Sequence, residues 1–109
     1  MSEILRQRRR LKNRRASVTF EIEAQNLRFT ASASRYADGS LAEISLQNHK
    51  AGSAAGILAQ DSAVICSLAL QFGAPLDVIR RALMRDAQGR AASPLGVALD
   101  CIPAKEERP

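Results

Sequence analysis

The sequence predicts an α+β fold: a three-stranded antiparallel β-meander packed on one face by a long α-helix plus two shorter C-terminal helices. Three observations lead to this prediction. Residues 17–48 alternate apolar and polar side chains, which is the pattern of half-buried strands. Residues 53–73 instead repeat apolar side chains at helical spacing. Turn-forming dipeptides at residues 25–26 and 38–39 divide the alternating region into three strands.

The three expected strands cover residues 17–24, 27–36 and 41–48. Their shared apolar face consists of Val18, Phe20, Ile22, Ala24, Leu27, Phe29, Ala31, Ala33, Ala42, Ile44 and Leu46. The opposite face carries Thr, Ser, Glu and Gln side chains, with Glu23 across from Arg28 as a favourable pair. We interpret this polar face as solvated, because antiparallel sheets commonly expose one side, and a binding surface is the alternative.

The two turns determine how the strands pair. A two-residue loop at residues 25–26 places apolar residues opposite apolar residues along the whole first hairpin. We expect Asp38 and Gly39 to form a type I′ turn, whose two central positions both need positive φ. That turn pairs Ala33 with Ile44 on the apolar face. A shift of one residue would break both matches, so the register is strongly specified.

The segment at residues 53–73 is expected to be the helix that covers the sheet. Ser53 is a suitable N-cap, and Gly73 followed by Pro75 ends the helix. The apolar stripe that we expect to cover the sheet consists of Ile57, Leu58, Val64, Ile65, Leu68, Ala69 and Phe72. Asp61 falls on or near this stripe, where it either bonds a backbone group or faces an interface.

Two shorter helices are expected within residues 75–85 and 93–102. In the first, the buried residues are Leu76, Ile79 and Leu83, and the outward-facing residues are Arg80, Arg81 and Arg85. In the second, Ser93 caps the helix and Pro94 takes its first position. The residues expected to close the core are Leu95, Val97, Ala98, Cys101 and Ile102.

The net charge of +5 is unevenly distributed along the chain. Seven basic residues lie in the first 15 positions, namely Arg6, Arg8, Arg9, Arg10, Lys12, Arg14 and Arg15. The remaining 94 residues carry nine basic and ten acidic side chains. We therefore divide the chain into a basic, disordered arm at residues 1–15, a folded domain at residues 16–103 and a flexible tail at residues 104–109.

The basic arm has two interpretations. The first is contact with nucleic acid or another polyanion through phosphate neutralisation by its arginines and lysine. The second is a solvated tail, or an arm that folds on a protein partner. No aromatic side chain lies between the arginines, so base recognition by stacking is not indicated.

The stretch HKAGSAAG at residues 49–56 has three interpretations: a phosphate cradle, a metal or catalytic site, or the entry to a helix. A Walker-type loop places its lysine after the glycines, whereas Lys50 precedes Gly52. A candidate anion site remains at Lys50, Gly52 and Ser53, because the start of any helix favours an anion, although plain helix entry is the favoured interpretation. His49 has no acidic residue or cysteine beside it, so a surface or capping role is favoured over a catalytic one.

The cysteine and hydropathy patterns limit the class of protein. Cys66 and Cys101 lie on apolar stretches, and we expect both to be reduced core residues. One histidine and no C-x-x-C motif argue against a zinc site, and we predict no metal, cofactor or catalytic residue. No apolar run approaches the ~20 residues that span a membrane. The N-terminus has no apolar segment of the secretory type, so we expect a cytoplasmic protein without a membrane partner.

From YADGSLAEISL onward the chain resembles the TSCPD domain, the C-terminal domain of cobalamin-dependent ribonucleotide reductases. The matching motifs are the D-G turn at residues 38–39, the strand motif at residues 43–46, the K-x-G-S helix entry at residues 50–53 and the helix end at residues 67–75. The likeness covers roughly residues 27–102. The chain is also similar to short stand-alone bacterial and phage proteins that carry only this domain.

The resemblance implies a link to deoxyribonucleotide synthesis. A full reductase needs a ten-stranded barrel, a radical-forming cysteine, two redox cysteines and a nucleotide site, which 109 residues cannot contain. We therefore expect a non-catalytic accessory or interaction module, whose partner is a protein such as a reductase subunit or a second copy that buries a sheet edge or helix flank. The alternatives are nucleic-acid binding through the arm, and nucleotide binding or ribonucleoside-diphosphate reductase activity, which only the resemblance implies.

Overall fold

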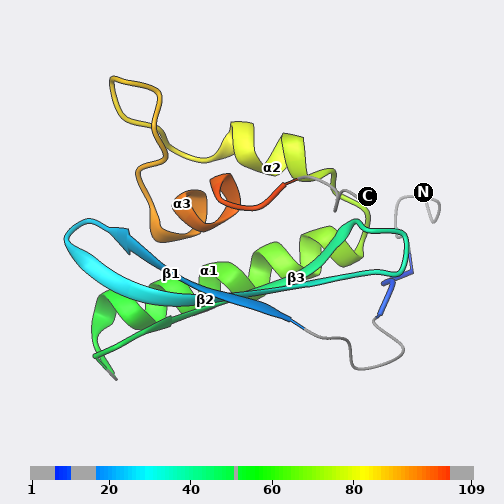
Figure 1. Cartoon of the computed structure of the whole chain (residues 1–109). Coiled ribbons are helices and arrows are strands. Elements are labelled where there is room, and N and C mark those ends of the chain that lie inside the picture. The colour runs from blue at the N-terminus through cyan, green and yellow to red at the C-terminus, as the bar shows by residue number, and fades with distance from the viewer. Residues whose placement is uncertain (1–6, 11–16, 51, 104–109) are drawn as a thin grey trace.

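A computed structural model describes residues 7–10, 17–50 and 52–103 of the chain. The elements, in chain order, are β1 (Val18–Ala24), β2 (Leu27–Arg35), β3 (Leu41–Asn48), α1 (Ala54–Gln71), α2 (Leu76–Ala82) and α3 (Pro94–Asp100) (Figure 1). The strands form one antiparallel sheet in the order β1-β2-β3. The predicted fold class, an antiparallel meander with one long and two shorter helices, is therefore confirmed.

The predicted strand register is also confirmed. Ala33 pairs with Ile44 across β2 and β3, and Glu23 pairs with Arg28 on the polar face of β1 and β2. The first hairpin turns through residues 25–26, which have φ values of 54° and 63°. Both central residues thus occupy the left-handed region, as the type I′ geometry of a two-residue hairpin requires.

The prediction of a type I′ turn for the second hairpin is wrong. Among its residues only Gly39 has a positive φ, of 92°. The Tyr36 N–H donates to the carbonyl of Ser40 at 2.9 Å, and the Gly39 N–H donates to the carbonyl of Tyr36 at 2.9 Å. This is a type I turn followed by a left-handed glycine, the usual three-residue hairpin loop. In this geometry the Asp38 carboxylate accepts bonds from the Ser40 N–H at 2.9 Å and from the Ser40 hydroxyl at 2.6 Å.

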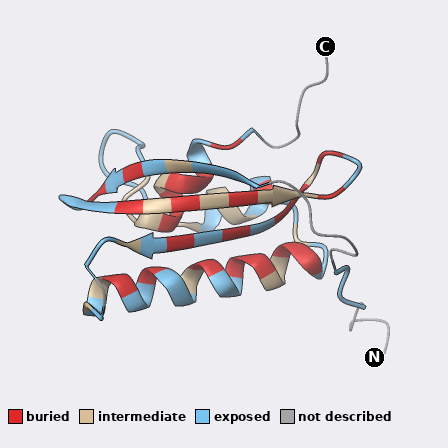
Figure 2. Ribbon diagram, turned by 60° about the horizontal axis from the view of Figure 1, so that its bottom comes forward, coloured by how far each residue is buried: buried red, intermediate tan, exposed pale blue. Residues whose placement is uncertain are grey.

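The core lies between the apolar face of the sheet and two helices, α1 along β3 and α3 against β1 (Figure 2). Its fully buried large side chains are Phe29, Ile44, Leu46 and Leu99. Val18 and Leu27 were predicted on the buried face but are exposed. Each is the first residue of its strand, so it lies at the rim of the sheet rather than under a helix.

The predicted buried stripe of α1 is wrong, because the helix is rotated the other way. The residues that it buries are Gly56, Ala59, Ala63, Cys66, Ser67, Leu70 and Gln71. Five of the seven predicted residues are exposed instead, and Leu68 and Ala69 are half-buried. Small side chains let the helix approach the sheet closely: a Cβ added to Gly56 would lie 2.9 Å from the Cβ of Asn48. A larger side chain there would push α1 away from β3.

The predictions for α2 and α3 hold in part. Ser93 and Pro94 begin α3 as predicted. Leu76 is buried on α2, and Leu95, Ala98 and Ile102 are buried on or just after α3, as expected. The remaining predicted aliphatic residues are half-buried.

Two predictions for these helices are wrong. Cys101 is exposed, because it follows the last turn of α3 on the solvent side, and Leu99 fills the core. Arg80 is half-buried rather than outward-facing, because its guanidinium donates to the carbonyls of Leu99 and Ile102 and so caps the end of α3.

Candidate functional site

The outward surface of α1 is the most unusual feature of the described structure. We call it the outer face of α1 and define it by Ile57, Leu58, Asp61, Val64, Ile65, Leu68 and Phe72. Ile57, Leu58, Val64, Ile65 and Phe72 keep between 44% and 69% of their full exposure. Figure 2 shows the helix with buried residues toward β3 and exposed residues on its other side. α1 therefore turns most of its large apolar side chains to solvent and, apart from Leu70 and Gln71 in its last turn, small ones to the core.

Two polar side chains set the rotation of α1. The Ser67 hydroxyl accepts from the Ile44 N–H at 3.0 Å and donates to the Ile44 carbonyl at 2.9 Å. One turn later, the Gln71 side-chain NH₂ donates to the Ala42 carbonyl at 3.1 Å. β3 is an edge strand, so these backbone groups have no neighbouring strand to bond. α1 thus covers the free edge of β3, and this contact directs the large apolar side chains away from the sheet.

The sequence contains a signal for this arrangement that the spacing of large apolar residues does not reveal. Gly56, Ala59, Ala63 and Ser67 recur at helical spacing and form a second stripe, made of small residues, opposite the apolar one. Hydrophobicity alone favours the stripe of larger residues as the buried one. The space between the helix and the sheet favours burial of the small-residue stripe instead, because close packing at this distance selects small side chains.

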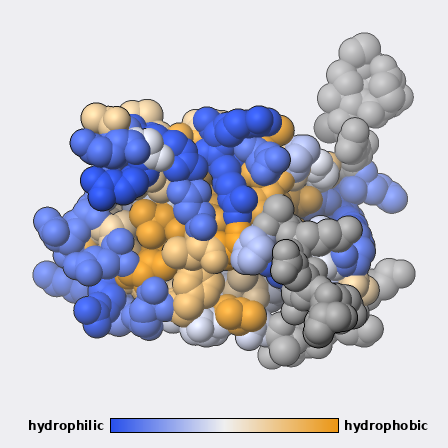
Figure 3. All heavy atoms as spheres, turned by 45° about the horizontal axis from the view of Figure 1, so that its top comes forward, coloured by the Kyte–Doolittle hydropathy of each residue, from blue (hydrophilic) through white to orange (hydrophobic). Residues whose placement is uncertain are grey.

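Four other large apolar residues are exposed, namely Val18, Leu27, Val78 and Met84, and they come from separate segments of the chain. The side of the molecule that carries α2 and α3 also shows a region of hydrophobic residues bordered by hydrophilic ones (Figure 3). Single exposed apolar residues are ordinary on a protein surface, whereas a stripe that runs the length of a helix marks a contact surface.

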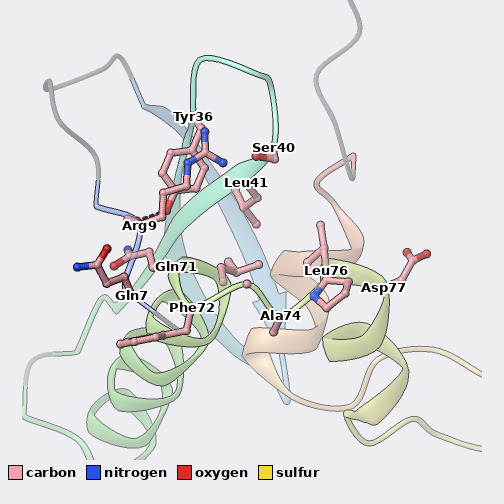
Figure 4. Close-up of a pocket in the computed structure, with 13 residues that line it drawn as sticks. Gln7, Arg9, Tyr36, Ser40, Leu41, Gln71, Phe72, Ala74, Leu76 and Asp77 are labelled. Carbon is pink, nitrogen blue, oxygen red and sulfur yellow. Dashed lines mark hydrogen bonds between the residues drawn. The ribbon is translucent and has the colours of Figure 1, made fainter. Parts of the chain in front are cut away.

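Part of the basic arm lies against the C-terminal end of α1 (Figure 4), where Arg8 and Arg9 contact the folded domain. The Arg9 N–H donates to the Gln71 carbonyl at 2.7 Å, and the Arg8 Nε donates to Gln71 Oε1 at 2.5 Å. The Arg9 guanidinium lies 3.8 Å from the centre of the Tyr36 ring and 3.3 Å from Asp38 Oδ2. The Tyr36 hydroxyl donates to the Arg9 carbonyl. Gln71 therefore joins this part of the arm to both α1 and β3.

These contacts border a hollow of about 520 Å³. Its walls come from the arm, the second hairpin, the end of α1 and the start of α2, with Arg9, Tyr36, Leu41, Phe72 and Leu76 among its residues (Figure 4). Burial raises the pKa of Tyr36 above its ordinary value, partly offset by the nearby Arg9 charge. The side-chain and backbone hydrogen bonds from Ser40 lower the pKa of Asp38 to about 2. Asp38 is therefore a fixed negative charge beside Arg9 at neutral pH.

The structure shows the hydrogen bonds and backbone conformation at the candidate anion site of Lys50, Gly52 and Ser53. The Ser53 hydroxyl accepts from the Gly56 N–H at 3.0 Å, which confirms its role as N-cap, and donates to Asn48 Oδ1 at 3.3 Å. The Lys50 N–H also donates to Asn48 Oδ1, at 2.9 Å. Gly52 has a φ of 78°, which a glycine adopts without strain. Asn48 thus organises the entry of the helix, and anion binding at this turn stays a prediction.

The remaining candidate residues are separated from one another. His49 lies on the exposed polar face, where its Nε2 is 3.1 Å from Glu21 Oε1 and 3.0 Å from Thr30 Oγ1. Cys66 is buried in α1, and burial raises the pKa of its thiol to about 11, so its nucleophilic thiolate is scarce at neutral pH.

The predicted nucleic-acid contacts lie only partly within the described residues. Arg8, Arg9 and Arg10 are described and exposed, whereas Arg6, Lys12, Arg14 and Arg15 lie outside the described residues. Within the described ranges, no group of three or more His, Cys, Asp or Glu side chains could hold a metal ion.

α1 also meets the length and composition criteria for a membrane-spanning helix, the one such helix in the part of the chain that the structure describes. Core helices of other proteins meet the same criteria, so this is weak evidence for insertion. No family model, curated protein or solved structure matches the chain. The resemblance to the TSCPD domain and the cytoplasmic location therefore stay predictions.

Proposed function

We propose that the chain is a protein-interaction module that docks through the outer face of α1. The observation that carries this proposal is the rotation of α1, which leaves five large apolar side chains in solvent along one helix. Removing apolar surface from water stabilises a complex by about 25 cal/mol per Å². A helix that places small residues on its own core and large ones outside has the composition of a contact helix.

The rigidity of the helix supports the same proposal. Ser67 and Gln71 hold α1 against β3 by hydrogen bonds on its inner side. These bonds fix the backbone of α1 before a partner arrives, so docking has to order the outer side chains but not the helix itself. The outer face runs from Ile57 to Phe72, a length of roughly 22 Å at ~1.5 Å per residue.

A photo-crosslinking experiment in the native host tests this proposal. A photoreactive phenylalanine analogue replaces Leu58, at the rim of the outer face, and in a matched variant replaces Glu23, on the polar face of β1 at the far edge of the sheet. We expect the Leu58 variant to form one dominant protein adduct that mass spectrometry identifies, and the Glu23 variant to form none. Equal or absent crosslinking at the two positions would reject the outer face of α1 as a contact surface.

We place this module in deoxyribonucleotide synthesis, as a non-catalytic accessory of a reductase. The support is the resemblance of residues 27–102 to the TSCPD domain. The test is calorimetric titration of the purified chain with the cobalamin-dependent reductase of its host, and with nucleoside di- and triphosphates in parallel. We expect saturable binding of the reductase and no heat from the nucleotides. The absence of reductase binding would remove the link to this pathway without affecting the outer face of α1.

Nucleic-acid binding through the arm is the second candidate, favoured by the seven basic residues among the first 15. In the structure, Arg8 and Arg9 contact the folded domain itself. Arg10, the third arginine of the arm that the structure describes, is exposed and makes neither of these contacts. A DNA or RNA fragment titrated at low salt tests this candidate. Binding that falls with salt and disappears when residues 1–15 are removed would support it, and failure to bind at low salt would exclude it.

A further inference from the structure

We infer that a second copy of the chain occupies the outer face of α1, with the two helices packed antiparallel about a two-fold axis that passes between Val64 and Ile65. This inference rests on the proposed function, because it names the partner of the same surface. A two-fold interface uses one patch twice, so the patch must be complementary to itself. The spacing, the charge and the area of the outer face each bear on that requirement.

Six of the seven positions of the outer face, 57, 61, 64, 65, 68 and 72, are symmetrically spaced. Leu58, at the rim, has no counterpart, because the matching position is the buried Gln71. Reversal about the midpoint between Val64 and Ile65 exchanges the first and last positions, the second and fifth, and the middle two, so the set maps onto itself. Antiparallel pairing therefore places Ile57 against Phe72 of the second copy, and Val64 against Ile65 of the second copy. A large apolar side chain meets another at each of these positions, as in a packed helix pair.

Asp61 determines the direction of the pairing. It is the only charged residue of α1 and lies in the middle of the outer face. Parallel pairing would place the two Asp61 carboxylates against each other in an apolar seam, where like charges repel with little solvent screening. Antiparallel pairing moves them roughly 10 Å apart along the helix axis, each beside Leu68 of the other copy. It also opposes the two helix dipoles, which is the favourable arrangement.

The area is appropriate for an association of this kind. With about 200 Å² for each fully exposed side chain, the five exposed residues leave roughly 550 Å² of apolar surface on each copy. A stable interface buries about 800 Å² on each partner. The outer face supplies about two-thirds of this area, and the two copies together bury more than the ~1,000 Å² expected of a biological interface.

A lipid bilayer is a poorer occupant of the same face. Amphipathic helices that lie on membranes carry Lys and Arg on their polar side, whereas α1 has no basic residue. The side opposite the outer face is packed against β3 rather than exposed to headgroups (Figure 2). Insertion would also place the Asp61 carboxylate in hydrocarbon, away from any cation of α1.

Sedimentation equilibrium of the full chain, over roughly 1–100 µM, tests the inference. We expect a dimer for the wild type and an at least 100-fold weaker dissociation constant for Ile65→Glu, which places two charges beside the axis. The control Val78→Glu changes a valine on α2 that is 50% exposed, against 66% for Ile65, and should leave the dissociation constant within threefold. Asp61→Ala should tighten the dimer at least threefold, and Asp77→Ala, on α2, should leave it unchanged. Circular dichroism of each variant identifies any that does not fold.

Three outcomes would overturn the inference. The first is a wild-type chain that remains monomeric at 100 µM, even where crosslinking at Leu58 captures a different protein; that result would leave the proposed function standing. The second is equal weakening of the dimer by Ile65→Glu and Val78→Glu. The third is a monomer that co-floats with vesicles of phosphatidylcholine and phosphatidylglycerol, and loses this binding in Ile65→Glu.

Discussion

Replacing Ser67 by Ala tests whether α1 is held in place by the free edge of β3. The Ser67 hydroxyl makes two hydrogen bonds to the backbone of Ile44, one as acceptor at 3.0 Å and one as donor at 2.9 Å. Ser67 is 8% exposed and Ile44 is 2% exposed, so water does not readily replace either bond. Alanine in place of Ser67 would therefore leave a buried N–H and a buried carbonyl without their side-chain partner.

The expected loss follows from these two groups. A buried polar group left without its partner costs about 1–3 kcal/mol. Because both groups lose the same single hydroxyl, we take about 2.5–3.5 kcal/mol for the pair, in the lower part of the range for two separate groups. Alanine regains about 0.5 kcal/mol through its higher helix propensity, which leaves a net loss of about 2–3 kcal/mol. For a domain of this size, each kcal/mol corresponds to roughly 4–8 °C, so the melting temperature should fall by roughly 8–24 °C.

The assay is urea unfolding of wild type, Ser67→Ala and Ser62→Ala at one protein concentration, since association shifts apparent stability. Ser62 also lies on α1, but its hydroxyl donates within the helix to the Ala59 carbonyl, at 2.7 Å. Its replacement should change the free energy of unfolding by less than about 0.5 kcal/mol. If the two variants agree within that margin, the reasoning about the edge of β3 is refuted.

Three further predictions concern other parts of the molecule. Arg80→Ala removes the guanidinium that bonds the carbonyls at the end of α3 and should lower the free energy of unfolding by about 2 kcal/mol, measured in urea. A thiol reagent at pH 8 should modify one cysteine, Cys101, in the folded chain and both after denaturation, because burial raises the pKa of Cys66 to about 11; two fast-reacting thiols would contradict this. The hydrogen bonds from Ser40 lower the folded pKa of Asp38 to about 2, below its ordinary value of 3.8, so the stability they confer should be complete above pH 3.8 and lost as the pH falls through about 2. NMR titration of the Asp38 carboxyl checks this, and a midpoint near 3.8 would disprove it.

The sheet was predictable from the sequence because strand periodicity and turn chemistry agree with each other. Alternation places Ala33 opposite Ile44, and a slip of one residue would bury the polar face. The type of the second turn was less predictable. Asp38 and Gly39 suit more than one loop, and the hydrogen bonds that Asp38 accepts from Ser40 select the three-residue form. Local sequence therefore specifies the pairing more firmly than the geometry of the loop.

The orientation of α1 was not predictable from hydrophobicity, because both sides of the helix are apolar. The larger residues, such as Ile65, form the more hydrophobic stripe, yet the side of α1 that approaches β3 consists mainly of small ones such as Ala63. The deciding contacts, made by Ser67 and Gln71, depend on which strand lies at the sheet edge. Likewise, the contact of Arg9 with the second hairpin joins residues far apart in the sequence and has no local signature.

A distance measurement between two copies tests the central claim most directly. A single spin label at Ala54→Cys, in a Cys101→Ser background that removes the exposed thiol, reports the distance between the first turns of two α1 helices. Antiparallel pairing about the midpoint of Val64 and Ile65 predicts a separation of about 30 Å, from ~1.5 Å per residue. Strong broadening from labels about 10 Å apart would indicate parallel helices, and the absence of any coupling would indicate a monomer; either result would contradict the assignment of the outer face of α1 to a second copy.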